Sequence, residues 1–365
     1  MRRDDDAIPA RGRGGSRPAL RPLAGISDNP GNLLGYFYVP PGFDGSLPLV
    51  VVLHGCTQDA SGYDRGSGWS RLAARHGFAL LFPEQQRSNN PALCFNWFTA
   101  GDSQRGMGEA ASIRSMIEAV RALHPIDPGR IFVTGLSAGG AMASVMLATY
   151  PETFSGGAII AGVAYGCASG VAEAFDCMGG RARSSADELG RRVRRASPHK
   201  GPWPKISVWQ GSADRTVVPS NADAIVLQWA HLHGLDPEPS RTETVDGYPR
   251  RVWTGRGGRE LIEQYIITGM AHGTPLNPGT GEGEAGIAGA HMIDASISST
   301  GRIAAFFGIA PAEAAAARPA SAKPASATLA RAGRASAARK PRAGGPAGGV
   351  QAVIEDALRA AGLMR

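Results

Sequence analysis

Long apolar runs are missing from this sequence of 365 residues, and their absence excludes some classes of protein. No stretch approaches the length that a membrane-spanning helix needs. The N-terminus begins Met1-Arg2-Arg3 and continues into Pro-, Gly- and Arg-rich sequence, without the apolar segment of a secretory signal peptide. Taken literally, this absence predicts a cytoplasmic protein, although a misplaced start codon or a non-standard export route would leave the same pattern.

Cysteine is also scarce. The four residues are Cys56, Cys94, Cys167 and Cys177, and they lack the spacing of a metal site, so we expect no metal. An even number permits two disulfides, which would indicate an oxidising compartment. That indication conflicts with the missing signal peptide, and the sequence leaves the conflict open.

Excess basic charge is absent from the centre of the chain, although the net charge of the whole is +7. Residues 1–22 hold six Arg and three Asp, and residues 311–349 hold seven Lys or Arg and one Glu. Residues 350–365 are balanced, so the remainder, 23–310, carries a net charge of −2. A near-neutral central part does not favour a basic nucleic-acid groove, and we expect no specific nucleic-acid partner.

The sequence contains instead an alternation of strand and helix patterns. Strands are expected at 33–40, 48–55, 78–83, 131–133, 157–163 and 206–209, with β-rich segments at 241–253 and 260–268. Helices are expected at 70–76, 108–124, 141–147, 220–232 and 299–307. The run 48–55 is apolar almost throughout, which is typical of a parallel strand buried on both faces. The alternation predicts one α/β domain over 26–309, with a mostly parallel central sheet flanked by helices.

Four segments depart from this alternation. Residues 1–25 are expected to be disordered, and 310–349 form a basic Ala/Pro-rich linker that cannot bury enough apolar surface to fold. The apolar positions of 350–365 recur at helical spacing and predict a short amphipathic helix. Residues 164–202 form a lid-like insertion, in which we expect the basic run 191–195 to be a solvated surface loop.

The sequence around Ser137 has the order of a nucleophile elbow. A short apolar strand, 131–133, leads into Gly135-Leu136-Ser137-Ala138-Gly139, and a helix of small residues follows at 141–147. Glycines two positions either side of the serine let strand and helix approach closely at a sharp turn. The five-residue match alone carries little weight in a chain with 50 glycines. The strand before it and the helix after it favour a nucleophilic serine over a structural turn.

A serine nucleophile needs a histidine base, which a carboxylate orients. Asp214 follows the strand 206–209, and His272 follows the β-rich segment 260–268. The order Ser137, Asp214, His272 is that of the α/β-hydrolases. All three residues follow strands, so we expect them on one edge of the sheet, where ligands bind in open α/β folds.

Other acids and histidines fit these roles less well. His291, beyond a glycine-rich loop, is the reserve for the base. Asp223 falls in the first turn of a helix, where a carboxylate suits the helix dipole. Asp246 belongs to a turn with Gly247.

Acyl transfer also needs two preorganised N–H donors, the oxyanion hole. We expect Ala138, the residue after the nucleophile, to supply one of them. The loop after the strand that ends at Leu53 is expected to supply the other, through the N–H of Cys56. We interpret His54 as a structural residue that holds this loop.

Further motifs stand in order with these residues, namely Leu53-His54-Gly55-Cys56-Thr57-Gln58, Cys94-Phe95-Asn96-Trp97-Phe98 and Arg105-Gly106. Together with the segments around Ser137, Asp214 and His272, they make the sequence resemble the poly(3-hydroxybutyrate) depolymerase-type esterases over about residues 33–308. That family also covers feruloyl and acetylxylan esterases. The resemblance implies an α/β-hydrolase fold and hydrolysis of carboxylic esters through an acyl-serine intermediate, with no metal or organic cofactor.

The resemblance also bears on the cysteines. In the family, the cysteine after His-Gly and the cysteine of Cys-x-Asn-Trp can lie close together, which implies a Cys56–Cys94 disulfide. Cys167–Cys177 would then be a local bridge across the insertion. In a cytoplasmic protein both pairs would be thiols.

The substrate implied by the resemblance is a short-chain hydroxyalkanoate polyester or its oligomers. Trp97 and Phe98 are candidates for an apolar wall around the acyl chain, with core packing as the plain alternative. The rival substrates are those of a feruloyl or acetylxylan esterase, or of a general short-chain carboxylesterase, and acyl transfer to an alcohol would use the same triad. Motifs determine the chemistry and loops the substrate.

The chain departs from the family in three respects. Polymer-degrading members typically carry a signal peptide and a separate substrate-binding domain, and neither is visible in this sequence. Phe95 replaces the first Trp of the common Cys-Trp-Asn-Trp motif. These departures weigh against secretion and against attack on crystalline polymer.

The basic tail favours a hypothesis from another class of function. Residues 310–349 would contact DNA or an anionic granule or membrane surface, while 350–365 dock on apolar material. The plain alternative is a disordered tail.

Overall fold

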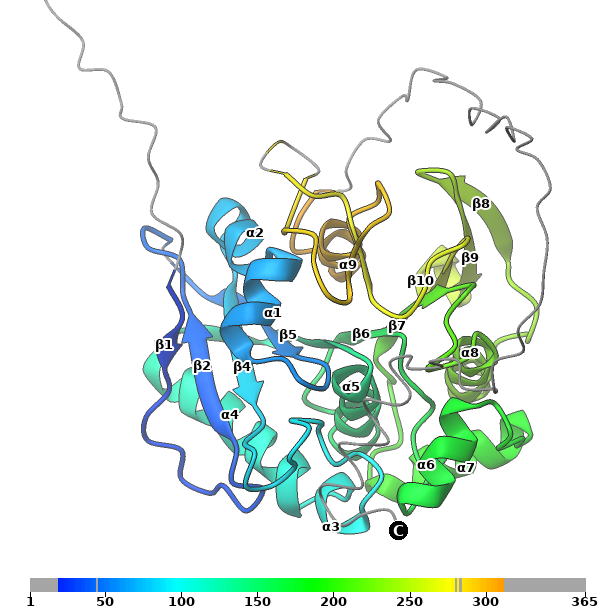
Figure 1. Ribbon diagram of the computed structural model, residues 1–365, viewed down its shortest axis with the longest axis horizontal. Coiled ribbons are helices and arrows are strands. Elements are labelled where there is room, and N and C mark those ends of the chain that lie inside the picture. Colours follow the sequence, from blue (N-terminus) through cyan, green and yellow to red (C-terminus); the bar gives the residue numbers. More distant parts are fainter. Residues whose placement is uncertain (1–18, 44, 280, 282–283, 312–365) are drawn as a thin grey trace, which may run out of the picture.

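A single large β-sheet forms the centre of the molecule (Figure 1). The computed structural model describes residues 19–43, 45–279, 281 and 284–311, and in these residues the sheet has ten strands in the order β1-β2-β4-β3-β5-β6-β7-β10-β9-β8. The strands are β1 (Arg21–Pro22), β2 (Leu34–Tyr38), β3 (Leu47–Leu53), β4 (Ala79–Glu84), β5 (Ile126–Leu136), β6 (Gly156–Ile160), β7 (Lys205–Gly211), β8 (Arg241–Val245), β9 (Tyr248–Thr254) and β10 (Glu260–Ile267). The six strands from β4 to β10 in this order run parallel, and the outer strands pair antiparallel. The predicted mostly parallel sheet is confirmed.

Strand β3 illustrates why the middle of the sheet is so apolar. All seven of its residues are buried. Leu49, Val51 and Leu53 belong to the hydrophobic core on one face of the sheet, whereas Val50 and Val52 belong to the core on the other face. Successive side chains of a strand point to opposite faces, so a strand buried on both sides needs apolar residues in succession.

Helices cover both faces of the sheet (Figure 1). One face carries α1 (Ala60–Ser67), α2 (Trp69–His76) and α9 (Ser299–Phe307). The other carries α3 (Ala100–Ser103), α4 (Gly108–Leu123), α5 (Ala138–Thr149), α6 (Val171–Met178), α7 (Ala186–Ala196) and α8 (Ser220–His233). Helix α5, which begins directly after Ser137, is buried at every position, and this explains its small and apolar composition.

The insertion at 164–202 contains the two helices α6 and α7, and the prediction of a surface loop at 191–195 is wrong. These residues belong to α7, whose N-cap Ser185 accepts a hydrogen bond from the N–H of Glu188. Arg191 pairs with Asp187, and Arg192 with Glu188, at the i,i+4 spacing that supports a helix. Buried Leu189 and Val193 hold the opposite side of α7 to the domain. The arginines are therefore solvated as expected, but on a packed helix.

The predicted disorder of residues 1–25 is wrong for the part that the structure describes. Arg21 and Pro22 pair with Phe37 and Tyr36 as the edge strand β1. Leu23 is buried, and its N–H donates to the carbonyl of Gly35 at 2.8 Å. Apolar Leu23 closes the edge of the core, which the Arg- and Gly-rich sequence before it conceals.

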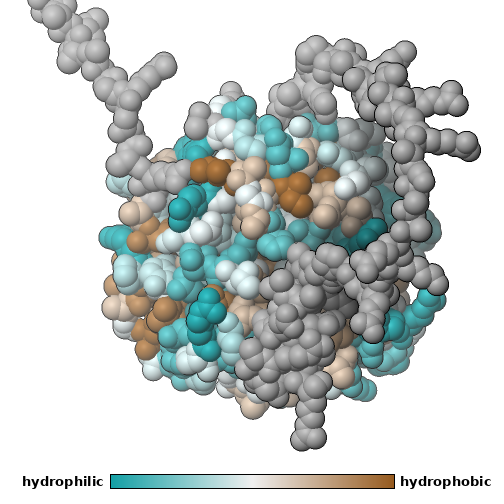
Figure 2. Space-filling view, viewed as in Figure 1, coloured by the Kyte–Doolittle hydropathy of each residue, from teal (hydrophilic) through white to brown (hydrophobic). Residues whose placement is uncertain are grey.

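The two expectations for the C-terminal tail, a linker at 310–349 and a helix at 350–365, lie outside the described residues apart from 310–311. In the described part of the chain no helix has the length and apolar character that crossing a membrane requires. Figure 2 shows small, separate hydrophobic patches among hydrophilic residues on the visible described surface.

Arg250, on β9, forms ion pairs with β10, the strand that leads into the His272 loop. These pairs predict that Arg250 contributes to the stability of the fold. Its guanidinium pairs with Glu243, Glu260 and Glu263, the last of which is buried on the neighbouring strand β10. Burial raises the pKa of the Glu263 carboxyl, and Arg250 opposes that rise. We predict that Arg250→Met lowers the free energy of unfolding by about 3 kcal/mol, because it leaves a buried carboxyl without its cation. Urea denaturation of the purified variant measures the change.

Arg251→Met is the matched control. The Arg251 side chain is 46% exposed, against 12% for Arg250, and lies on the same strand. Its loss should cost less than about 1 kcal/mol. Equal effects of the two variants would contradict the importance of the buried pair.

Candidate active site

Ser137 lies at a strained turn between β5 and α5. Its backbone has φ 56° and ψ −116°, and its N–H donates to the carbonyl of Ile160 at 2.9 Å. A Cβ at Gly135 would lie 2.4 Å from backbone atoms of Gly139, and a Cβ at Gly139 would lie 2.3 Å from the carbonyl oxygen of Leu53. Only glycine permits these approaches, so the Gly-x-Ser-x-Gly pattern has a measurable steric cause.

Asp214 and His272 meet in a buried hydrogen bond. The two atoms, His272 Nδ1 and Asp214 Oδ2, are 2.7 Å apart, and both side chains are nearly inaccessible. The other carboxylate oxygen of Asp214 accepts from the N–H groups of Thr216 at 2.8 Å and Val217 at 2.9 Å. Gln210 donates a further hydrogen bond to Oδ2 at 3.1 Å. The carboxylate is thus fixed in place, with one oxygen directed at the imidazole.

The two loops that carry this pair are packed directly on each other. The N–H of Ala213 donates to the carbonyl of Met270 at 3.0 Å. A Cβ at Gly211 would lie 2.3 Å from the same carbonyl oxygen, so the close approach requires glycine. Because β5, β7 and β10 are parallel, their carboxyl ends bring Ser137, Asp214 and His272 to one edge of the sheet.

The competing residues have other partners. Nδ1 of His291 lies 3.1 Å from the carbonyl oxygen of His272, and its own carbonyl accepts the N–H of Thr274 at 2.8 Å. His291 therefore contacts the backbone of the His272 loop, not Asp214. Asp223 accepts a hydrogen bond from Gln264, and Asp246 pairs with Arg302.

Ser137 lies at the wall of an apolar pocket that opens to solvent. Cys56, Ala138, Trp97 and Phe98 line the same pocket, so the structure brings these predicted residues together around the serine. The rings of Trp97 and Phe98 are perpendicular, with centroids 5.3 Å apart, and both are mostly buried. They are therefore at once pocket wall and part of the core.

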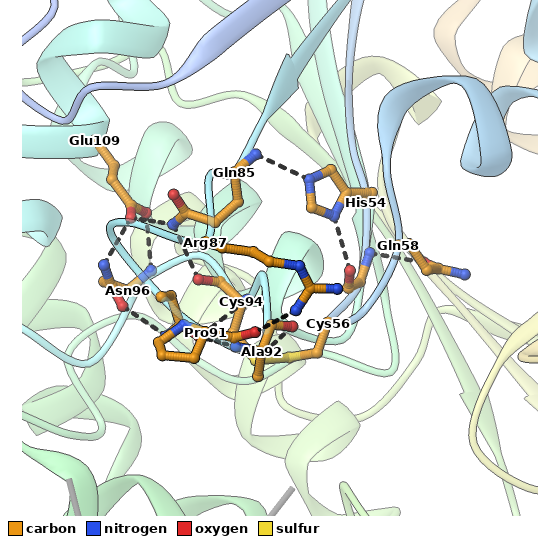
Figure 3. The surroundings of a disulfide bond; sticks show 12 residues. His54, Cys56, Gln58, Gln85, Arg87, Pro91, Ala92, Cys94, Asn96 and Glu109 are labelled. Atoms are coloured by element: carbon orange, nitrogen blue, oxygen red, sulfur yellow. Dashed lines mark hydrogen bonds between the residues drawn. A yellow bond between two sulfur atoms is a disulfide. The ribbon is translucent and has the colours of Figure 1, made fainter. Parts of the chain in front are cut away.

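The loop of Cys56 is tied to the loop of Cys94 by a disulfide, with the two Cα atoms 4.2 Å apart (Figure 3). His54, two residues before Cys56, is fully buried: its Nδ1 donates to the carbonyl of Gly55 at 2.7 Å, and its Nε2 accepts the backbone N–H of Gln85 at 3.1 Å. Both ring nitrogens are engaged in a way that requires a neutral imidazole. This arrangement agrees with the interpretation of His54 as structural.

A second disulfide joins Cys167 to Cys177 within the insertion, with a Cα–Cα distance of 6.0 Å. The two pairs are those that the family resemblance implied. Cys177 lies on α6, so the bond ties this helix to the segment before it. Among the described residues no group of three or more His, Cys, Asp or Glu side chains is arranged to hold a metal ion.

Sequence reasoning missed one wall of the pocket. Val171, Ala174, Phe175 and Met178, all on α6, face it, and Val217 completes that side. The four α6 positions recur at i, i+3, i+4 and i+7, the spacing of an amphipathic helix, so the signal was present in the sequence. The spacing does not predict the surface against which this helix packs.

A serine at a strained strand-to-helix turn, a buried aspartate–histidine pair and a mostly parallel sheet define the class of α/β-hydrolases. Comparison with known proteins narrows this class. The family model described as esterase PHB depolymerase matches residues 34–243. The chain belongs to this esterase family.

Three relatives illustrate its range. The chain is 47% identical to poly(3-hydroxyalkanoate) depolymerase C of Paucimonas lemoignei, over 80% of this chain and 70% of the relative. It is 32% identical to an acetylxylan esterase of Coprinopsis cinerea, over 70% and 69% of the two chains. A solved acetyl xylan esterase from Aspergillus awamori superposes with a TM-score of 0.64 at 27% identity, covering 70% of this chain and 94% of that one. The chain is thus a carboxylic ester hydrolase of the α/β-hydrolase fold.

We predict that buried His54 makes the protein less stable in acid. Burial lowers the pKa of His54 to about 4, from an ordinary value of 6.5. The stabilisation that neutral His54 provides is complete above about pH 6.5 and is lost as the pH falls through about 4, which lowers the free energy of unfolding by about 3 kcal/mol. Chemical denaturation over this pH range measures the loss.

His54→Gln should flatten this part of the pH dependence, since it removes the group that titrates. His199→Gln, at a surface histidine, is the control and should keep the dependence of the natural sequence. If the stability of His54→Gln depends on pH as that of the natural sequence does, His54 is not the group that causes the loss of stability in acid.

Proposed function

We propose that this ester hydrolase cleaves short-chain hydroxyalkanoate polyester, or its oligomers, through an acyl-enzyme on Ser137. The observation that carries the proposal is the position of Ser137 in an apolar pocket, beside loops that hold a buried Asp214–His272 pair. An apolar pocket suits a small aliphatic acyl chain. The identity with a relative named as a poly(3-hydroxyalkanoate) depolymerase supports the same substrate class.

In the first half of the reaction, Ser137 Oγ attacks the ester carbonyl carbon and His272 accepts the hydroxyl proton at Nε2. Asp214 holds the proton on Nδ1, which keeps Nε2 free to act as the base and stabilises the imidazolium. The negative charge on the carbonyl oxygen is stabilised by the N–H groups of Cys56 and Ala138. These donors are fixed before the reaction, one by a disulfide-bonded loop and the other by the first turn of α5.

The tetrahedral intermediate then expels the alcohol, which takes the proton from His272, and this completes the first half of the reaction. The acyl group remains on Ser137 as an ester. Water then attacks this ester, with His272 again accepting a proton, and the carboxylic acid leaves while Ser137 regains its hydrogen.

We further propose that Trp97 and Phe98 form a wall for the acyl chain, facing the side chains of α6. Both rings line the same pocket as residues of α6, which supports a contact between the lid-like insertion and the substrate. An acetyl group is small and would contact only part of this apolar wall, so the wall favours a longer acyl chain. The second candidate, an acetylxylan or feruloyl esterase, is supported by the similarity to the fungal relatives.

We predict that Ser137→Ala abolishes ester hydrolysis, with a loss of at least about 10⁴-fold, because no nucleophile remains. Amorphous poly(3-hydroxybutyrate) granules, p-nitrophenyl butyrate, acetylated xylan and a methyl hydroxycinnamate are the substrates to compare. The Ser240→Ala variant, at a serine outside the Asp214 and His272 loops that accepts the N–H of Thr254, is the control and should keep most activity.

Clearing of granules by the natural chain but not by Ser137→Ala is the expected result. Activity restricted to acetylated xylan or the hydroxycinnamate would move the substrate to the second candidate and leave the chemistry intact. Full hydrolysis by Ser137→Ala would refute the proposed nucleophile.

We also propose that the basic residues of 310–349 bring the enzyme to an anionic granule surface. Their net positive charge supports this role, because it attracts an anionic surface. Since salt screens this attraction, the binding should weaken as the salt concentration rises. A chain ending at residue 311 should lose salt-dependent granule binding while keeping its rate on p-nitrophenyl butyrate. Unchanged granule binding by that chain would exclude the tail from the contact.

A further inference from the structure

A buried polar network lies beside the loop of Cys56 (Figure 3). At its centre is Glu109, in the first turn of α4, which has no exposed surface. Its Oε1 accepts hydrogen bonds from the side-chain amides of Gln85 at 2.5 Å and Asn96 at 2.9 Å, and its Oε2 accepts the backbone N–H of Asn96 at 2.8 Å. All of these partners belong to the segment that follows β4.

Gln85 connects this carboxyl to the loop that carries Cys56. Its side-chain amide also donates to the carbonyl of Cys94 at 2.9 Å, and its backbone N–H donates to Nε2 of His54 at 3.1 Å. The side-chain oxygen of Gln85 accepts two hydrogen bonds, from the N–H of Gln86 and from Asn89, so the amide has only one satisfied orientation. The contacts therefore run without interruption from Glu109 to His54.

A second route reaches the other side of Cys56. Cys94, held by Gln85, is disulfide-bonded to Cys56. The next residue, Thr57, has a left-handed φ of 64°, and its N–H donates to the carbonyl of Ala92 at 2.7 Å. The backbone of Cys56 is thus held before, at and after its own position by groups that the segment 85–96 positions.

We propose that Glu109 is a positioning residue for the oxyanion hole, since its hydrogen bonds hold the segment 85–96 that fixes the N–H of Cys56. This inference rests on the proposed function, in which that N–H binds the oxyanion. Trp97 directly follows Asn96, so the same carboxyl also sets the start of the proposed acyl wall.

The surroundings of Glu109 support this role. Burial, with a smaller contribution from the nearby Asp102 carboxylate, raises the pKa of Glu109 to about 8. A carboxyl group is unfavourable in the interior unless it has hydrogen-bond partners. The partners of Glu109 are donors of Gln85 and Asn96, which lie in the segment 85–96. Such a residue gives a loop one defined geometry, which apolar packing alone provides less strictly.

The test is Glu109→Gln, which keeps the size of the side chain but removes one of the two accepting oxygens. Glu118→Gln is the matched control, because Glu118 lies on the same helix and its side chain is 45% exposed. The measurements are kcat and KM for p-nitrophenyl butyrate, the inhibition constant of an aliphatic trifluoromethyl ketone and the midpoint of thermal unfolding. The ketone adds to the serine as a tetrahedral oxyanion and so reports the hole itself.

We expect Glu109→Gln to lower kcat/KM by about tenfold or more and to weaken ketone binding by the same factor, with KM nearly unchanged. Glu118→Gln should behave as the natural chain. A folded Glu109→Gln that loses only thermal stability, with kcat and ketone affinity unchanged, would overturn the proposal.

If Glu109→Gln does not fold, Gln85→Met takes its place, since it removes the side-chain bridge and keeps the backbone bond to His54. The same paired loss in kcat/KM and ketone affinity is expected, and its absence counts against the proposal. Ser137→Ala, measured in parallel, distinguishes failure of the proposed function from failure of the positioning role of Glu109. Activity in Ser137→Ala removes the proposed site altogether, whereas an inactive Ser137→Ala beside an unaffected Glu109→Gln removes only the positioning role.

Discussion

The left-handed backbone of Ser137 is the constraint on which the rest of the site depends. A non-glycine residue in this conformation is strained by about 1–3 kcal/mol and persists only where its surroundings leave no alternative. The surroundings here are the fully buried helix α5, the adjacent strand β6 and the backbone contacts of Gly135 and Gly139. Strand, turn and helix can therefore move only as one body, and the serine is presented at a fixed point above the sheet.

The other parts of the site are brought to that point by the same sheet edge, and each has its own internal support. The Asp214 loop and the His272 loop are bonded to each other through Ala213 and Met270. The loop of Cys56 is held by a disulfide and by the polar contacts of Gln85 and His54. Hydrogen-bond donors that are fixed before a reaction stabilise developing charge without reorganisation. Under the proposed function, these contacts hold the Cys56 N–H in place to act as such a donor.

Substrate choice depends on a different part of the molecule. One wall of the pocket comes from α6, within the insertion, and the Cys167–Cys177 disulfide joins that helix to the segment before it. Relatives named as a poly(3-hydroxyalkanoate) depolymerase and as an acetylxylan esterase are 47% and 32% identical to this chain. We therefore assign the proposed chemistry to the sheet edge, and the proposed acyl preference to the loops and the insertion around it.

The sequence by itself determined the strand–helix alternation, the parallel sheet and the positions of Ser137, Asp214 and His272. These are local signals: continuous apolar runs, a glycine-flanked serine and polar residues directly after strands. It did not determine the helical nature of 191–195, the ordered strand β1 or the part played by Glu109. Those depend on what each segment packs against: a buried Val193, the edge of β2, and the amides of Gln85 and Asn96. Glutamate in a first helical turn usually serves the helix dipole in solvent. Only the tertiary structure buries Glu109 against the segment 85–96, and the positioning role that we propose for it depends on that burial.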